Sequence, residues 1–296
     1  MTASARAAAG AFVPMPPLAH AHACPAAGAF VRGDGGVLLE QARSCAAGAP
    51  SIGGPPQDRR SATEKDHHMS RIVIVGGHGR VALLLAPILA ARGDDVVSLI
   101  RDPAQSADVA AAGAVPKALS VEEASTEELA SAFAGADAIA WSAGAGGRGG
   151  PERTDAIDRA AAIRSMDAAS RAGVRRYVMV SWVGSHGDDP VPADHPLRNY
   201  ALAKLAADRR LVGTDLEWTV VGPGTFTLED PSGKIDVRRR NGQGDSLYTS
   251  RGNVAAVIAA VLAEPASVGK VIPFGDGSTP IAQAVESVPA EFSDLS

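Results

Sequence analysis

Closely spaced glycines directly after the first apolar run of the chain are suited to bind a phosphate group. Residues 71–75 read Arg-Ile-Val-Ile-Val, and Gly76 and Gly79 follow before the helical pattern of 81–92. Glycines here let the backbone approach a pyrophosphate, whose charge the amino end of the next helix stabilises. Ala82 is small enough for that helix to pack closely on the strand. Alone, such glycines could be only a tight turn; between a strand and a helix they predict nucleotide binding.

The residue after the second expected strand indicates which nucleotide is bound. NAD-preferring domains have an acidic residue there for the ribose 2′-hydroxyl, and NADP-preferring domains have an arginine. Arg101 is the first polar group after this strand, and Arg80 could bring a second positive charge to a 2′-phosphate. We therefore expect NADP(H), with NAD(H) possible. If Arg101 and Asp102 only form an exposed loop pair, NAD would serve as well.

Tyr200 and Lys204 have the spacing of a proton-transferring pair on a helix. Side chains four residues apart lie on one helical face, so the Lys204 ammonium could lie near the Tyr200 phenol. A nearby positive charge favours phenolate and lowers a pKa that is about 10 when unperturbed. Tyr200 could then act as a general acid toward a carbonyl.

Apolar runs alternate with helical patterns throughout the segment that positions these residues. Ser125 and Glu128 form a capping box, Gly93 is a helix terminator, and Pro87 is expected to kink the first helix. The pattern predicts an α/β fold with a doubly wound, mostly parallel, Rossmann-like sheet in a single domain, 69–296, with a small C-terminal substrate region. We expect strands at 71–75, 95–100, 114–119, 137–142, 176–181, 217–221 and 270–274, and helices at 81–92, 103–112, from 125, 152–172, 196–212, 253–263 and 281–288.

Several segments in the same order resemble the atypical short-chain dehydrogenase/reductases, in their NmrA-like and biliverdin reductase B-like NAD(P)H-binding branch. The resemblance covers Met69 to about Val288. It lies in VGGHGRVA (75–82), DAIAWSAG (137–144), AGVRRYVMVS (172–181), the Tyr200-Lys204 pair, LEWTVVGPG (216–224) and GSTPI (277–281).

The resemblance implies a catalytic set of Ser181, Tyr200 and Lys204. Tyr200 would be the general acid, Lys204 would bind the nicotinamide ribose, and Ser181 would orient the carbonyl oxygen during hydride transfer. The residues expected at the cofactor are Gly76, Gly77, His78, Gly79, Arg80, Val81, Arg101, Ala143, Gly144, Lys204 and Pro223.

Composition and charge exclude several classes of protein. The chain has 296 residues, 46% hydrophobic residues and a net charge of −5, which is a poor match for nucleic-acid binding. It has no 18-residue apolar span, so we expect no membrane helix and a cytoplasmic protein. Both cysteines, Cys24 and Cys45, precede Met69, so the domain offers neither a disulfide nor a thiol nucleophile.

Residues 1–68 are rich in Ala, Pro and Gly and have no sustained helix or strand period, which predicts a disordered tail. They could equally be an upstream stretch translated from a wrongly chosen start, with Met69 the natural beginning. Pro residues interrupt the only candidate for a secretory apolar run.

A few further residue types could bind a ligand but are better explained structurally. Trp141 and Trp218 are expected to pack in the core, while Trp182 could either pack or contact a ligand. Histidines and acids between 186 and 195 are irregularly spaced, so we expect a solvated substrate loop and no metal site; these are His186, Asp188, Asp189, Asp194 and His195. The basic run 238–240 could be a solvated turn or attract an anionic substrate.

These features favour an oxidoreductase that transfers hydride between NADP(H) and a small carbonyl, quinone or flavin-like substrate. A non-catalytic NADP(H)-binding redox sensor has the same sequence features. A sugar-nucleotide epimerase is a weaker alternative, because only about 75 residues follow Gly222, too few for the usual substrate domain. The sequence allows a monomer or a homodimer and does not identify the substrate.

Overall fold

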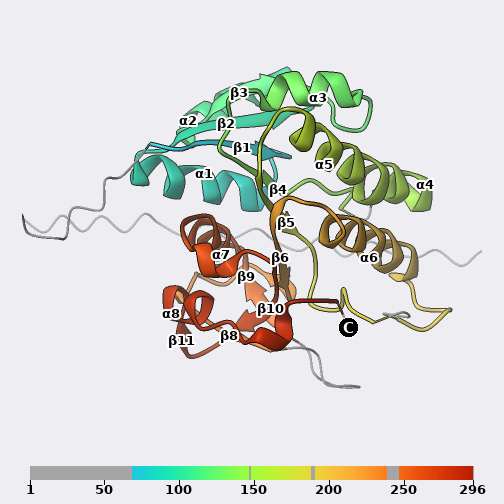
Figure 1. Cartoon of the computed structure of the whole chain (residues 1–296), viewed down its shortest axis with the longest axis vertical. Helices are drawn as coiled ribbons and strands as arrows, with labels where there is room; N and C mark the ends of the chain where they lie inside the picture. Colours follow the sequence, from blue (N-terminus) through green and yellow to red (C-terminus); the bar gives the residue numbers. More distant parts are fainter. Residues whose placement is uncertain (1–68, 147, 188–190, 239–246, 296) are drawn as a thin grey trace, which may run out of the picture. The chain divides into compact units, whose positions relative to one another are not determined.

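The computed structural model describes residues 69–146, 148–187, 191–238 and 247–295 (Figure 1). The predicted tail at 1–68, with both cysteines, lies outside the described residues, as do Asp188, Asp189, Arg239 and Arg240. No helix within the described ranges is long and apolar enough to cross a membrane.

The first strand, turn and helix form as the sequence predicts. Strand β1 (Arg71–Val75) leads into helix α1 (Arg80–Arg92), and β2 (Asp95–Ile100) pairs parallel with β1. Side chains of β1 alternate between two cores, with Ile72 and Ile74 in one and Val73 and Val75 in the other. Gly93 ends α1 at a φ of 93°, which only glycine adopts readily.

The remaining elements of the parallel part follow in the predicted order. They are η1 (Pro103–Gln105), α2 (Ser106–Ala111), β3 (Val115–Ala118), α3 (Thr126–Phe133), β4 (Ala138–Trp141), α4 (Gly150–Thr154), the π-helical η2 (Asp155–Ala161), α5 (Ala162–Arg171), β5 (Arg176–Val180), α6 (Arg198–Val212), β6 (Glu217–Pro223), α7 (Arg251–Ala263), η3 (Pro265–Ser267), β10 (Lys270–Asp276), α8 (Ile281–Glu286) and η4 (Ala290–Phe292). The Ser125–Glu128 capping box is confirmed at the start of α3. The helix predicted over 152–172 contains the π segment η2.

The main sheet among the described residues has the strand order β11-β8-β10-β6-β5-β4-β1-β2-β3. The strands from β10 to β3 pair parallel, which confirms the predicted doubly wound sheet. Two short strands that the sequence pattern did not predict, β8 (Lys234–Val237) and β11 (Thr279–Pro280), add an antiparallel edge. Two others, β7 (Thr225–Thr227) and β9 (Tyr248–Ser250), pair with each other.

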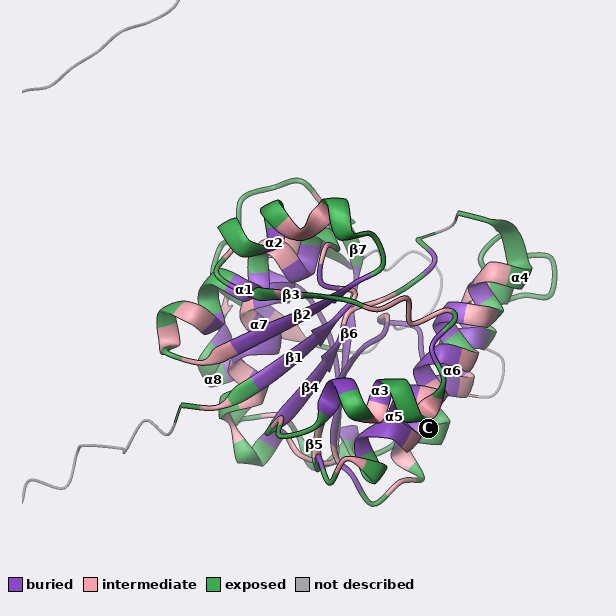
Figure 2. Ribbon diagram, turned by 90° about the horizontal axis from the view of Figure 1, so that it is seen from above, coloured by how far each residue is buried: buried purple, intermediate pink, exposed green. Residues whose placement is uncertain are grey.

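Helices cover both faces of the sheet. Helices α1, α7 and α8 contribute to one core, and α3, α5 and α6 contribute to the other (Figure 1). The central strands between these layers are almost entirely buried (Figure 2). Strand β1 lies between β2 and β4, so the chain changes direction across the sheet at this point. In such sheets the crevice at the carboxyl ends beside this change is where ligands bind.

Candidate active site

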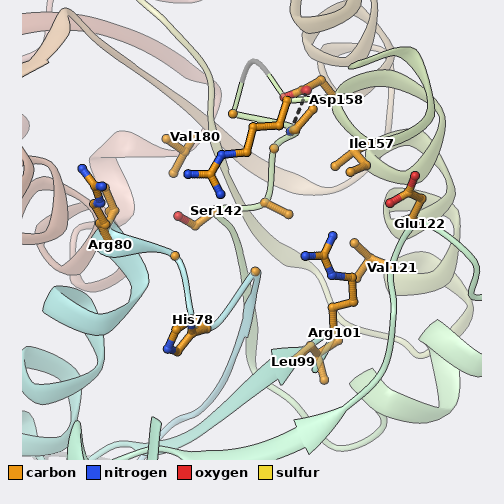
Figure 3. A pocket seen from close by; sticks show the side chains of 18 of the residues that line it. His78, Arg80, Leu99, Arg101, Val121, Glu122, Ser142, Ile157, Asp158 and Val180 are labelled. Atoms are coloured by element: carbon orange, nitrogen blue, oxygen red, sulfur yellow. Dashed lines mark hydrogen bonds between the residues drawn. The ribbon is translucent and has the colours of Figure 1, made fainter. Parts of the chain in front are cut away.

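A cleft of about 630 Å³ opens at the carboxyl ends of the central strands (Figure 3). Its volume is in the range of pockets for small molecules and cofactors. Most residues singled out from the sequence line it together: Gly76, His78, Gly79, Arg80, Val81, Arg101, Ala143, Gly144, Ser181, Tyr200 and Lys204.

Two of the predicted cofactor residues, Gly77 and Pro223, are not among the lining residues. The Gly77 amide donates to the Leu99 carbonyl oxygen at 2.8 Å, and a Cβ at this position would lie 2.4 Å from the Cβ of Ser98. The Pro223 carbonyl oxygen accepts from the Val183 amide at 2.9 Å. The backbone groups of Gly77 and Pro223 are therefore hydrogen-bonded to neighbouring segments of the chain.

The turn after β1 has the shape that a pyrophosphate requires. Gly76 has a φ of 82°, and a Cβ there would lie 2.7 Å from the Ala143 Cα, so a larger residue would displace the loop after β4. Helix α1 begins after Gly79 without a side-chain cap, whereas Ser125 and Ser250 cap α3 and α7. The first amides of α1 thus remain available to an anion in the cleft, and the turn fits a dinucleotide.

Two arginines lie on opposite sides of this end of the cleft. Arg80 extends from the start of α1, and Arg101 extends from the end of β2 (Figure 3). The Asp102 carboxylate accepts a hydrogen bond from the Ala104 amide at 3.0 Å and caps the turn η1. Its acceptor capacity is therefore partly used by the backbone, while Arg101 lines the cleft.

Lys204 is buried beside the end of the cleft that Tyr200 lines. Its ammonium donates to the Val180 carbonyl oxygen at 2.9 Å and lies 3.5 Å from the carboxylate of Asp158. The side chains of Lys204 and Asp158 are only 4% and 1% exposed. Removing either partner of such a pair would leave the other charge buried without compensation.

Asp158 also holds the loop after β4. Its second oxygen accepts from the Ala145 amide at 3.0 Å, the dashed bond of Figure 3. A Cβ at Gly144 would lie 2.9 Å from the Asp158 carboxylate, so glycine permits this close approach. The carboxylate thereby joins the loop that lines the cleft to Lys204 on α6.

Sequence reasoning missed Asp158 as a site residue. The residue lies in η2, and a π-helical turn inserts one extra residue, which shifts side chains relative to an α-helix. The only signal in the sequence was an acid between Ile157 and Ala161, which are buried. Helical periodicity alone could not distinguish it from the exposed acid Asp155 three residues earlier.

Tyr200 lines the cleft and stacks edge-on against Trp182, with ring centroids 6.2 Å apart. Burial, and then the carboxylates of Asp158 and Asp208, raise the pKa of the Tyr200 phenol above its ordinary value. The expected lowering of this pKa by Lys204 is therefore wrong, because the ammonium is held by Val180 and Asp158. Tyr200 is therefore a neutral phenol and a weaker acid than an unperturbed tyrosine.

Ser181 lies just beyond β5, and its hydroxyl donates to the carboxylate of Asp208. The hydroxyl of Ser185 donates to the same oxygen of Asp208. Burial raises the pKa of Asp208 to about 6, although both hydrogen bonds and Lys204 oppose the rise. Sequence reasoning missed Asp208, although Tyr200, Lys204 and Asp208 follow one another at intervals of four on α6.

The other residues considered from the sequence have mostly structural positions. Trp141 and Trp218 are buried in the core, as predicted. The ring of His195 accepts from the Leu197 amide at 3.1 Å. The described part of the chain contains no group of three or more His, Cys, Asp or Glu side chains that could hold a metal ion.

Comparison with known proteins gives a family for this arrangement. Residues 76–265 match the family model described as NAD(P)H-binding. A UPF0659 protein of Schizosaccharomyces pombe is 32% identical over 235 residues, which cover 73% of this chain and 94% of that protein.

Two solved structures have a similar fold and sequence. One, from Bacillus halodurans, carries the provisional name of an NAD-dependent epimerase/dehydratase; it is 32% identical with a TM-score of 0.68, covering 74% of this chain and 100% of that chain. The oxidoreductase YlbE of Lactococcus lactis is 30% identical with a TM-score of 0.65, covering 74% and 96%. The chain therefore belongs to the NAD(P)H-binding family and has the Rossmann fold.

Proposed function

We propose that the protein is an NADP(H)-dependent oxidoreductase that transfers hydride between the nicotinamide and a small carbonyl, quinone or flavin-like substrate. One observation carries the proposal: the glycine turn, Arg101 and the Tyr200–Lys204 pair line the same cleft at the carboxyl ends of the sheet. A cofactor held by the first two features would extend toward the third.

The preference for NADP(H) over NAD(H) rests on charge at the glycine-turn end. The uncapped amino end of α1 would bind the pyrophosphate, and Arg101, assisted by Arg80, would bind the 2′-phosphate. The Asp102 carboxylate caps η1, so it is less available to accept a hydrogen bond from the ribose 2′-hydroxyl of NAD(H).

The bound nicotinamide would supply a hydride, whose electron pair forms a C–H bond at the substrate carbonyl carbon. Tyr200, kept protonated by its surroundings, would donate its proton to the carbonyl oxygen, so that an alcohol and the oxidised cofactor result. Solvent would then return a proton to Tyr200. Lys204, fixed by Val180 and Asp158, would bind the ribose next to the nicotinamide.

The test is a titration of the full chain with NADPH and NADH, followed by turnover of NADPH with 4-nitrobenzaldehyde, menadione and FMN. We expect tighter binding of NADPH and measurable turnover of at least one substrate. Tyr200→Phe should lower kcat by about 10²-fold or more and leave the NADPH dissociation constant within about threefold, since general acid catalysis contributes 10²–10⁴. Tyr248→Phe, at an exposed tyrosine, is the matched control and should behave as wild type.

The same experiment separates the reductase from a redox sensor, and a second assay with a sugar nucleotide as substrate tests for an epimerase. A redox sensor would bind NADPH tightly without turnover of any compound in the panel. An epimerase, as the name of the Bacillus halodurans protein suggests for that relative, would convert a sugar nucleotide without net consumption of its cofactor. Failure to bind either nucleotide would contradict all three functions.

A further inference from the structure

Ser181 separates the cleft from a carboxyl group that has no place in the proposed reaction. Ser181 lines the cleft, whereas Asp208 is fully buried and is not among the lining residues. One oxygen of Asp208 accepts from both Ser181 and Ser185, and its other oxygen, although buried, has no hydrogen-bond partner among the residues that the structure describes. A buried carboxyl with a free oxygen directly behind a cleft hydroxyl calls for a physical explanation.

A serine hydroxyl has one proton. If Ser181 donates this proton to Asp208, it can only accept a hydrogen bond from a group in the cleft. While Asp208 is ionised it can only accept, and the Ser181 proton points toward it. Only the lone pairs of Ser181 then remain for the cleft, and these bind a hydroxyl group. Once Asp208 carries a proton, it can donate to the Ser181 oxygen and free the Ser181 proton for a carbonyl oxygen.

We propose that Asp208 is a positioning residue that sets the direction of the Ser181 hydrogen bond, so that the cleft favours a carbonyl when Asp208 is protonated and an alcohol when it is ionised. The inference rests on the proposed function, since it takes Ser181 as the group that meets the substrate oxygen. The switch forms or breaks only the O–H bond of the Asp208 carboxyl, whose proton comes from solvent or returns to it.

The surroundings allow Asp208 to change its protonation in an accessible pH range. Burial raises its pKa to about 6, against the hydrogen bonds of Ser181 and Ser185 and the positive charge of Lys204. Within the described ranges, the other ionisable groups whose charge couples to Asp208 are the phenols of Tyr177 on β5 and Tyr200 on α6. Burial raises the pKa of both phenols, so they stay neutral over this range.

The proposal predicts opposite pH responses for the two directions of the reaction. The experiment measures KM between pH 5 and 8.5 for 4-nitrobenzaldehyde reduction and 4-nitrobenzyl alcohol oxidation, or for the carbonyl and alcohol pair that the wild type converts fastest. The aldehyde KM should rise about tenfold per pH unit above the Asp208 pKa, whereas the alcohol KM should fall as the pH rises to that pKa and stay level above it.

Asp208→Asn should flatten both profiles, because an amide does not titrate and fixes the direction of Ser181 in either rotamer. Ser181→Ala should also flatten them, since it removes the hydroxyl that transmits the change. Asp167→Asn, at an exposed acid on α5 paired with Arg210, is the matched control and should keep the wild-type profiles. Wild-type profiles in Asp208→Asn would overturn the proposal while leaving the proposed function intact.

A second readout does not depend on turnover. Infrared difference spectra of the full chain should contain a protonated carboxyl band that disappears as the pH rises through about 6. This band should be absent in Asp208→Asn, shifted in Ser181→Ala and unchanged in Asp167→Asn. A band that Ser181→Ala does not shift, or none assignable to Asp208, would overturn the inference even if the enzyme proved inactive on every substrate tried.

Discussion

At the glycine-turn end the cleft is made of backbone and exposed arginines, whereas at the Tyr200 end it is made of charged side chains buried in the protein. Arg80 and Arg101 are exposed, while Asp158, Lys204 and Asp208 are buried. The difference indicates that removing a side chain at the glycine-turn end should weaken ligand binding without lowering stability. At the second end, stability and protonation are coupled to function, because buried charges depend on their partners.

The largest effect should follow from breaking the buried pair at the Tyr200 end. Asp158→Asn leaves the Lys204 ammonium without its counter-charge at 4% exposure, so we expect a loss of about 3–5 kcal/mol in unfolding free energy. Urea denaturation measures it. The double variant with Lys204→Met should recover most of the stability but not the activity.

Asp155→Asn is the control for this substitution, because Asp155 lies in the same π segment but forms an exposed pair with Arg159. Asp155→Asn should lower the unfolding free energy by less than about 1 kcal/mol. If Asp158→Asn and Asp155→Asn lost equal amounts of unfolding free energy, the proposed distinction between buried and exposed charges in η2 would be wrong.

At the glycine-turn end, Arg101→Ala should change binding and leave stability untouched. Loss of a charge-assisted contact to the 2′-phosphate should weaken NADPH binding about tenfold to a hundredfold, corresponding to about 1.5–3 kcal/mol. NADH binding should change little, and calorimetric titration with both nucleotides measures the ratio. Arg175→Ala, at an exposed arginine paired with Glu217 near the amino end of β5, is the control. An equal loss for both nucleotides would refute the assignment of Arg101 to the 2′-phosphate.

A smaller effect should connect the pKa of Asp208 with stability. Its pKa is about 6 in the folded protein and about 3.9 when unfolded, so the folded state binds this proton more tightly. The stability that the proton provides is present below about pH 4 and is lost as the pH rises to about 6.

The unfolding free energy of Asp208→Asn should therefore increase relative to that of the wild type as the pH rises, by about 2 kcal/mol between pH 4 and 7. Urea denaturation of both proteins across this range measures the difference, with Asp167→Asn as the reference for an exposed acid. A constant difference across the range would mean that Asp208 does not change its protonation there.

Local sequence was sufficient for the elements and for most of the cleft. Gly93 ends α1 in the left-handed conformation, and Ser125 caps α3 together with Glu128, because both depend on neighbours within a few residues. The same holds for Gly76 and Arg101, which the strand-turn-helix order brings to the carboxyl edge. The small strands β8 and β11 escaped prediction, because their pairing comes from distant parts of the chain.

The sequence by itself determined the doubly wound sheet, the glycine turn and the Tyr200–Lys204 spacing, since periodicity and turn chemistry are local properties. Only the tertiary structure decided what surrounds these groups. It buried Asp158 and Asp208 beside them, raised the pKa of Tyr200 and directed the Ser181 proton toward Asp208. The physical reason is that desolvation and the distance between charges depend on how η2, α6 and β5 pack, and no single segment of the sequence carries that information.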